Sequence, residues 1–263
     1  MAEGPLPPGL GAALASLAGC ERVLVALDFD GVLAPLVDDP EASRPVAGAM
    51  EVALALSALP GTTVALVSGR DLATLDRLSG ATDPLVRVGS HGAEPSWRDG
   101  VPLTADQQAL LETLDSELAA VAAAHPDARL EVKPTSRVVH TRGLDAAVSG
   151  PALDSAAEVA RRHPGVHTTP GKDVFEMAVV EGGKGPAITD LARDRGADGV
   201  LYAGDDVTDE RAFEHLATQE GLRVVVRVKV GDGPTAAEHR LGDETAVVGM
   251  LGELLRLREH AGR

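Results

Sequence analysis

The stretch VLVALDFDG, residues 23–31, begins as an uninterrupted apolar run and ends abruptly in two acids and a glycine. A short apolar run without polar alternation is typical of a strand that is buried on both faces of a parallel sheet. Four further runs of this kind are TTVALVSGR (62–70), PLVRVGSHG (84–92), GVLYAGDD (199–206) and LRVVVRVKV (222–230). Together these runs predict a parallel sheet.

Helical patterns separate the predicted strands, as expected for an α/β protein. They cover 45–58, with Pro45 at its start, and 71–79, 185–196, 208–218 and 248–258. Regular alternation of strands and helices predicts a Rossmann-like, doubly wound parallel sheet with helices on both faces.

Residues from about 100 to 172 break this rhythm. Thr104 and Gln107 form the sequence signature of a capping box, and a helical apolar face follows them. Two alternating segments at 129–134 and 136–141, a helix near 151–163 and a strand at 173–179 come next. We therefore expect a smaller α+β domain over residues 99–173, inserted into a core formed by residues 1–98 and 174–263.

Composition limits the classes of function. The chain has 263 residues, 44% of them apolar, and a formal net charge of −16, which disfavours nucleic acid and anionic membranes as partners. No apolar run reaches the length of a membrane-spanning helix, and the N-terminus lacks the features of a secretory signal. The single cysteine, Cys20, suits a reducing compartment. We expect a folded cytoplasmic protein.

Acidic residues gather where two predicted strands end. Asp28 and Asp30 follow the first strand, and Asp205, Asp206 and Asp209 follow the fourth. Because ligands of open parallel sheets bind at the carboxyl ends of the strands, these carboxylates are expected to converge and to need a hard cation such as Mg²⁺. A single acid in such a place is more often a helix cap, but two clusters favour the metal site.

Ser68 and Lys184 add candidate phosphate ligands. Ser68 ends the second strand in VSGR, and Lys184, one of four lysines, begins a helix within EGGKGPAITD. Two other motifs are excluded by the sequence. DFDG begins like an EF-hand loop, but Val32 and Leu33 replace residues that this loop requires, and Gly185 follows Lys184 where a nucleotide-binding loop requires Ser or Thr.

Taken in order, DFDGVLAP (28–35), VSGR (67–70), Lys184 and GDDVTDE (204–210) resemble the four motifs of the haloacid dehalogenase superfamily of phosphohydrolases. The resemblance implies that Asp28 is the nucleophile, that Asp30 is the general acid and then base, and that the inserted domain is a cap. It further implies roles for residues at the matching positions: Ser68 and Lys184 for the phosphoryl group, Gly69 and Arg70 for substrate, Asp28, Asp30, Asp205 and Asp206 for Mg²⁺, and Asp209 for support. Val32 departs from the threonine that many relatives carry.

Three further segments resemble trehalose-6-phosphate phosphatases: GSHGAE (89–94), EVKPTSRVVHTR (131–142) and GKDVFEM (171–177). This resemblance implies a set of sugar-binding residues: His91, Glu94, Lys133, His140, Arg142, Lys172 and Glu176. An alternative reading is that Lys133, His140 and Arg142 only alternate on the exposed face of a sheet.

We therefore expect a magnesium-dependent phosphatase that converts trehalose 6-phosphate into trehalose and phosphate through an aspartyl phosphate, with a functional link to a trehalose-phosphate synthase. Two alternatives remain open at this point. One is a phosphatase for another sugar phosphate, such as sucrose phosphate or glucosylglycerol phosphate. The other is a catalytically silent, sugar-phosphate-binding regulatory subunit, which the combination of Asp28, Asp30, Ser68, Lys184 and Asp205 disfavours.

Overall fold

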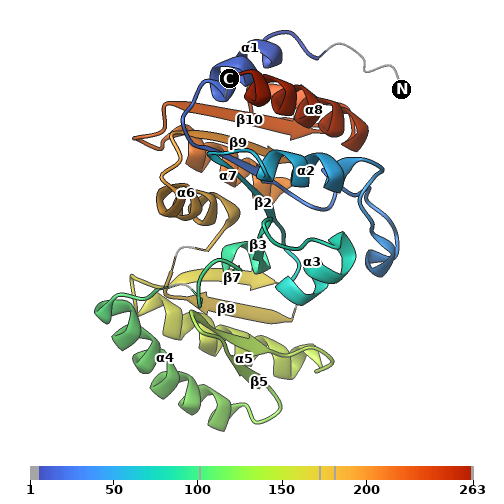
Figure 1. Cartoon of the computed structure of the whole chain (residues 1–263). Coiled ribbons are helices and arrows are strands. Elements are labelled where there is room, and N and C mark those ends of the chain that lie inside the picture. The colour runs from blue at the N-terminus through green and yellow to red at the C-terminus, as the bar shows by residue number, and fades with distance from the viewer. Residues whose placement is uncertain (1–5, 101, 172, 181, 262–263) are drawn as a thin grey trace. The chain divides into compact units, whose positions relative to one another are not determined.

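The computed structural model describes residues 6–100, 102–171, 173–180 and 182–261 (Figure 1). The chain forms two compact units, Met1–Asp99 with Gly183–Arg263, and Gly100–Gly182. The second boundary lies after Gly182, whereas the sequence placed it after Asp173. The reason is that the strand at Val174–Ala178 pairs with strands of the smaller unit and with none of the larger sheet.

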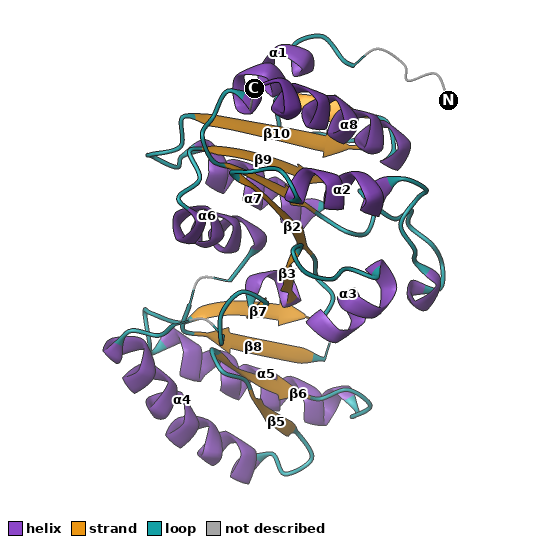
Figure 2. Ribbon diagram, in the orientation of Figure 1, coloured by secondary structure: helices purple, strands orange, loops and turns teal. Residues whose placement is uncertain are grey.

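The larger unit is built on a seven-stranded sheet with the order β11-β10-β9-β1-β2-β3-β4 (Figure 2). Its strands are β1 (Val23–Leu27), β2 (Thr62–Val67), β3 (Val86–Gly89), β4 (Glu94–Pro95), β9 (Gly199–Gly204), β10 (Val224–Val230) and β11 (His239–Leu241). All neighbours are parallel except β3 and β4. The predicted doubly wound sheet is thereby confirmed.

Successive side chains of β1 are buried on opposite faces of this sheet. Val25 belongs to a core cluster with residues of α1 (Leu10–Ala18), α2 (Ala49–Ser57), α3 (Leu72–Ser79) and α8 (Glu244–Ala261). Leu24 belongs to a second cluster with residues of α6 (Lys184–Arg195) and α7 (Val207–Ala217). Burial on both sides explains why the strand has no polar alternation.

The smaller unit has a four-stranded antiparallel sheet with the order β5-β6-β8-β7. Its elements are α4 (Ala105–Ala124), β5 (Arg129–Val132), β6 (Ser136–His140), α5 (Ala146–Arg161), β7 (His167–Gly171) and β8 (Val174–Ala178). The helix–strand–strand order occurs twice. The predicted capping box is present, since Thr104 and Gln107 each accept a hydrogen bond from the other's backbone N–H.

One face of the smaller sheet packs against its two helices, where Leu114, Val159 and Met177 lie in one core cluster. Side chains with the opposite alternation, including Glu176 and His140, are hydrogen-bonded to polar neighbours on the sheet. Several short elements were not predicted: α1, β4, β7, β11 and the 3₁₀ helices at Pro40–Ala42 and Ser90–Gly92. Over the described residues, no helix is both long enough and apolar enough to span a membrane.

Candidate active site

Three site residues lie at one edge of the larger sheet, where three parallel strands end. Asp28 directly follows β1, Ser68 follows β2 and Asp205 follows β9, and β1 lies between the other two strands. Parallel strands end at the same edge, so side chains that are 177 positions apart in sequence are brought together. Of the five acids that were expected to converge, Asp28, Asp205 and Asp209 do so.

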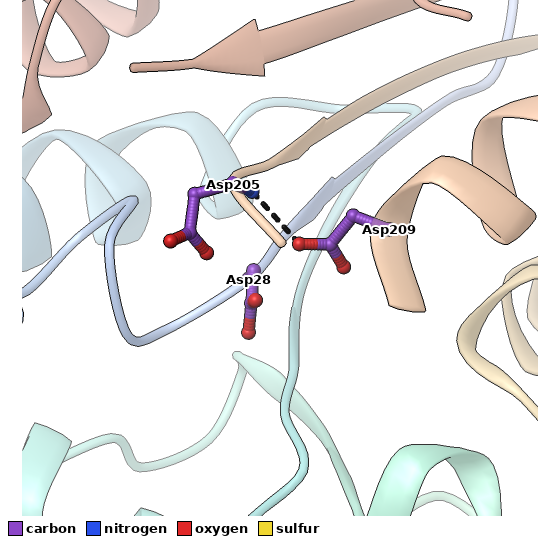
Figure 3. A group of neighbouring side chains, drawn as sticks. All are labelled: Asp28, Asp205 and Asp209. Atoms are coloured by element: carbon purple, nitrogen blue, oxygen red, sulfur yellow. Dashed lines mark hydrogen bonds between the residues drawn. The ribbon is translucent and has the colours of Figure 1, made fainter. Parts of the chain in front are cut away.

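Carboxylates form the centre of the site. One oxygen from each of Asp28, Asp205 and Asp209 lies within 4.8 Å of the other two, and this is the group that could hold a cation among the described residues. Figure 3 shows the three side chains converging from the end of β1, the loop after β9 and α7. Asp28 and Asp209 are buried and Asp205 is half-buried. Like charges at this spacing require neighbouring cations.

Lys184 supplies one of these cations. It begins α6, and its Nζ donates hydrogen bonds to Asp28 Oδ2 at 2.6 Å and to Asp209 Oδ1 at 2.7 Å. Burial disfavours its charged form, but Asp28 and Asp209 together raise the pKa of Lys184 above its ordinary value. Burial also raises the pKa of Asp28, and the Lys184 ammonium opposes that rise. Lys184 is therefore a fixed positive charge beside Asp28.

Both carboxylate oxygens of Asp209 accept hydrogen bonds. Besides Lys184, the hydroxyl of Tyr202 donates to its Oδ1 at 2.5 Å, and the backbone N–H groups of Asp205 and Asp206 donate to its Oδ2. Burial opposes ionisation, yet these donors lower the pKa of Asp209. Asp209 thus acts as an ionised anchor that fixes the loop after β9.

Asp206, expected beside the metal, caps the helix that follows it. Its Oδ1 accepts hydrogen bonds from the backbone N–H groups of Thr208 and Asp209 and so caps α7. Asp206 is exposed, and the third carboxylate of the group with Asp28 and Asp205 is that of Asp209. A capping role is what the sequence suggests for a lone acid at a helix start.

Asp205 fits the role of a cation ligand. Burial, with the nearby carboxylates of Asp209 and Asp206, raises its pKa to about 6, which is the response of a carboxylate whose charge is insufficiently balanced by the protein. Gly31 leaves room for it, because a Cβ at Gly31 would lie 2.1 Å from Asp205 Oδ2. All-oxygen ligands around unbalanced negative charge suit a hard divalent cation.

Asp30 is held by Arg70. The guanidinium donates from Nε to Asp30 Oδ2 at 2.6 Å and from Nη2 to Oδ1 at 2.8 Å, and the Ser43 hydroxyl donates to Oδ1 at 2.9 Å. This bidentate pair raises the pKa of Arg70. Arg70, expected to contact substrate, therefore engages the expected general acid in this structure.

Ser68 and the segment after β3 complete this edge of the sheet. Ser68 is 1% exposed, and its Oγ accepts a hydrogen bond from the backbone N–H of Arg70. The ring of His91 lies over Gly69, where a Cβ would come within 2.6 Å of it. Glu94 accepts from Leu72 N–H and from the Ser90 hydroxyl. Glu94 thus tethers the segment that carries His91 to the start of α3.

Some of the expected sugar-binding residues of the smaller unit lie close to one another. Lys133 Nζ lies 3.2 Å from Glu176 Oε1, which also accepts from the Ser136 hydroxyl at 2.6 Å. His140 Nε2 lies 2.6 Å from Glu131 Oε2, and Glu131 was not among the residues expected at the site. Arg142 is exposed in the turn after β6. Lys172 lies outside the described residues.

Two buried polar residues of the larger unit were also missed. Tyr202, on β9, is fully buried, and Lys229, on β10, is 5% exposed and donates a hydrogen bond to the backbone carbonyl of Asp205. The sequence signals that could have pointed to them are a tyrosine within the apolar run of β9 and a lysine near the end of the valine-rich β10. Separately, a pocket of about 530 Å³ lies where β1 and β2 begin, and Arg22, Thr62 and Arg195 are among its lining residues. The acid group is at the opposite ends of these strands.

A doubly wound core, acids at the carboxyl edge of its sheet, a buried lysine beside them and an inserted α+β unit define a phosphohydrolase of the haloacid dehalogenase superfamily. Residues 26–245 match the trehalose-phosphatase family, and the chain belongs to that family. The resemblance seen in the sequence is thereby confirmed.

Individual relatives agree with this family. The chain is 32% identical to a bifunctional trehalose-6-phosphate synthase/phosphatase of Thermoproteus tenax, over 90% of the chain and 32% of that protein. It is 35% identical to a trehalose-phosphate phosphatase of Mycolicibacterium paratuberculosis, over 81% of the chain and 57% of that protein. The chain therefore spans about a third to somewhat over half of these relatives.

A solved structure resembles the chain over nearly its full length. The trehalose-6-phosphate phosphatase of Aspergillus fumigatus superposes with a TM-score of 0.69 at 25% identity, covering 94% of this chain and 97% of that one. Both the core and the inserted unit are therefore shared with that protein.

Proposed function

We propose that this chain hydrolyses trehalose 6-phosphate to trehalose and inorganic phosphate. The observation that carries the proposal is the position of Asp28, a buried carboxylate 2.6 Å from Lys184 within a group of three acids, in a chain of the trehalose-phosphatase family. A nucleophilic carboxylate beside a fixed cation is the arrangement that covalent phosphoryl transfer needs.

In the first step, a carboxylate oxygen of Asp28 attacks phosphorus, and the bond between phosphorus and the sugar oxygen breaks. Asp30 gives its proton to the departing sugar oxygen, so trehalose leaves as a neutral alcohol. In the second step, Asp30 accepts a proton from water as the water oxygen attacks phosphorus. The acyl phosphate is cleaved, inorganic phosphate leaves and the Asp28 carboxylate is restored.

Lys184 and Ser68 orient the reacting groups. Lys184 holds Asp28 Oδ2 while the backbone N–H of Phe29 donates to Oδ1 at 2.6 Å, so both oxygens have defined positions. The Ser68 hydroxyl is proposed to donate to a phosphoryl oxygen, with Gly69 next to it allowing close approach of the backbone. For Asp30 to transfer a proton, Arg70 must release at least one of its oxygens, and a phosphoryl group offers Arg70 an alternative anionic partner.

We propose Mg²⁺ as the cofactor, held by the carboxylates of Asp28 and Asp205 and by the backbone carbonyl of Asp30. Bound there, the ion would supply positive charge that offsets the carboxylates and the phosphoryl group. Asp209 would keep Asp205 in place through its hydrogen bond to the Asp205 backbone N–H.

Sugar recognition is assigned to the inserted unit as a cap domain. Lys133 and Glu176 form an ion pair, and each of them can bind sugar hydroxyls. Further proposed substrate-binding residues are His140, Arg142 and Lys172 of this unit, and His91 and Glu94 of the larger unit. The bifunctional relative joins a phosphatase to a synthase in one protein, which supports a functional link between this chain and a trehalose-phosphate synthase.

Phosphate release from a panel of sugar phosphates, with and without magnesium, tests the proposal. We expect trehalose 6-phosphate to give the highest kcat/KM, sucrose phosphate and glucosylglycerol phosphate to be poor substrates, and chelation of magnesium to stop turnover. Asp28→Asn should abolish turnover while retaining substrate binding. Equal rates across the panel would contradict the substrate assignment, and tight binding without phosphate release in the wild-type chain would indicate a regulatory subunit instead.

A further inference from the structure

Lys229 is a buried lysine outside the four motifs that define the site. It lies on β10, paired in register with Gly204, the last residue of β9 and the residue directly before Asp205. Its ammonium donates a hydrogen bond to the backbone carbonyl of Asp205. Burying an ammonium costs free energy unless partners compensate for its lost hydration, so its partners indicate its task.

A carboxylate, that of Glu210, also faces this lysine. Glu210 Oε1, in the first turn of α7, lies 3.7 Å from Lys229 Nζ and is a buried oxygen without a hydrogen-bond partner among the described residues. Its Oε2 accepts from the backbone N–H of Ala236, in the connection between β10 and β11. Lys229 therefore stands between the loop after β9 and the start of α7.

Both backbone polar groups of Asp205, its N–H and its carbonyl, are thus held by hydrogen bonds. Its N–H donates to Asp209 Oδ2 at 2.7 Å, and its carbonyl accepts from Lys229. With both ends of the residue held, the Asp205 side chain is directed over Gly31 toward Asp28. Fixed orientation of a ligand is what partners outside the metal's own ligands provide.

We propose that Lys229 is a positioning residue that holds the Asp205 carbonyl, directs the Asp205 carboxylate toward Asp28 and thereby sets the affinity of the acid group for a divalent cation. The inference rests on the magnesium site of the proposed function. It adds a residue from the neighbouring strand to that site, and it gives the buried charge of Lys229 a purpose that is separate from phosphate binding by Lys184.

Arg227 offers a matched control on the same strand. It is two residues from Lys229, so the two side chains share a face of β10, and it also bonds a carbonyl of the core, that of Phe213, and pairs with Glu238. None of these partners belongs to the acid group. Arg227→Gln and Lys229→Met should therefore both lower the thermal stability, but Arg227→Gln should leave the cation site unchanged.

The experiment measures Mg²⁺ binding to the purified full chain by isothermal titration calorimetry without substrate. We expect Lys229→Met to weaken Mg²⁺ affinity by about 10- to 100-fold, the usual effect of removing a residue that orients a metal ligand. The Mg²⁺ concentration for half-maximal turnover should rise by the same factor, while KM for the sugar phosphate at saturating Mg²⁺ stays unchanged. Lys229→Arg, which can still donate to the carbonyl, should restore most of the affinity.

The outcomes separate this inference from the proposed function. Mg²⁺ affinity in Lys229→Met equal to that of the wild type and of Arg227→Gln would overturn the inference while leaving the magnesium site standing. A wild-type chain that binds no Mg²⁺ would overturn both. If Lys229→Met does not fold, Lys229→Gln replaces it, because glutamine keeps a donor group but has a shorter reach and no charge, and it should also weaken Mg²⁺ binding.

Discussion

Arg70 holds both carboxylate oxygens of Asp30, at 2.6 and 2.8 Å. The two residues come from different motifs and follow different strands, β1 and β2. The proposed general acid is therefore ion-paired before substrate arrives, and its release is part of the proposed reaction.

Asp30→Asn tests the role of Asp30. An asparagine keeps one acceptor oxygen, which can still accept from Arg70 Nη2 and from the Ser43 hydroxyl as Asp30 Oδ1 does, so the variant should fold, but it cannot transfer a proton. We expect kcat to fall by about 10²- to 10⁴-fold, the usual contribution of general acid–base catalysis, with substrate binding retained. Steady-state phosphate release and equilibrium binding measure the two effects.

Ser43→Ala is the control for that variant. It removes the hydrogen bond from Ser43 to Asp30 Oδ1 and leaves both hydrogen bonds from Arg70 in place. It should keep most of the wild-type kcat. An Asp30→Asn enzyme as active as Ser43→Ala would show that Asp30 transfers no proton.

Gly31→Ala should impair the acid group through a direct clash. Gly31 has φ +74°, and a Cβ there would lie 2.1 Å from Asp205 Oδ2. The left-handed backbone alone costs a residue with a Cβ about 1–2 kcal/mol. We expect a loss of stability of at least that size together with weaker Mg²⁺ binding, measured by chemical denaturation and calorimetry.

Gly80→Ala separates strain from the clash. Gly80 has φ +66° and nothing within 4 Å of the Cβ position. An alanine there would therefore have the same backbone strain as one at Gly31, but no steric clash. The variant should be destabilised but bind Mg²⁺ normally. Normal Mg²⁺ binding in Gly31→Ala as well would argue against Asp205 as a ligand.

Tyr202→Phe removes one donor from a buried, ionised carboxylate. Asp209 Oδ1 would keep Lys184 but lose the hydroxyl at 2.5 Å. Because hydrogen bonds to charged groups contribute about 1.5–3 kcal/mol, we expect a decrease of that order in the free energy of unfolding. Urea denaturation measures it, and an unchanged midpoint would mean that water or Lys184 replaces the hydroxyl.

Acid should weaken the smaller unit through Asp115. Arg137 is 7% exposed in its side chain, and its hydrogen bonds lower the pKa of Asp115 below its ordinary value of 3.8. A lowered folded-state pKa contributes stability that is present above the ordinary value and is lost as the pH falls through the folded one. We expect Asp115→Asn to unfold at lower urea concentration at pH 7.

The difference between Asp115→Asn and the wild type should shrink as the pH falls below about 4, because the wild-type carboxyl then becomes neutral as well. Urea midpoints from pH 7 to pH 3 measure this convergence. Parallel curves for the two proteins would show that the pair with Arg137 contributes no pH-dependent stability. Asp115 is 44% exposed, so solvent screens part of the effect.

Much of the fold could be predicted because its signals are local. The five apolar runs contain β1, β2, β3, β9 and β10, and Thr104 with Gln107 begins α4 as expected. The elements that were missed depend on neighbours. β7 is exposed along its length and contains Pro170 and Gly171, so only its pairing with β8 makes it a strand. The nine-residue α1 is too short to be stable alone and packs Leu10, Leu14 and Leu17 into the core.

The sequence by itself indicated that Asp28, Ser68, Lys184 and Asp205 would gather at one edge of a parallel sheet. Apolar runs show where strands end, parallel strands end at the same edge, and the four motifs resemble those of the haloacid dehalogenase superfamily. The sequence could not determine which side chains pair there. The tertiary structure paired Asp30 with Arg70, turned Asp206 into a cap and Asp209 into an anchor, and brought Lys229 to the Asp205 carbonyl. Such pairings depend on side-chain directions across neighbouring strands and helices, and distances of a few ångströms between them are set only when the whole core packs.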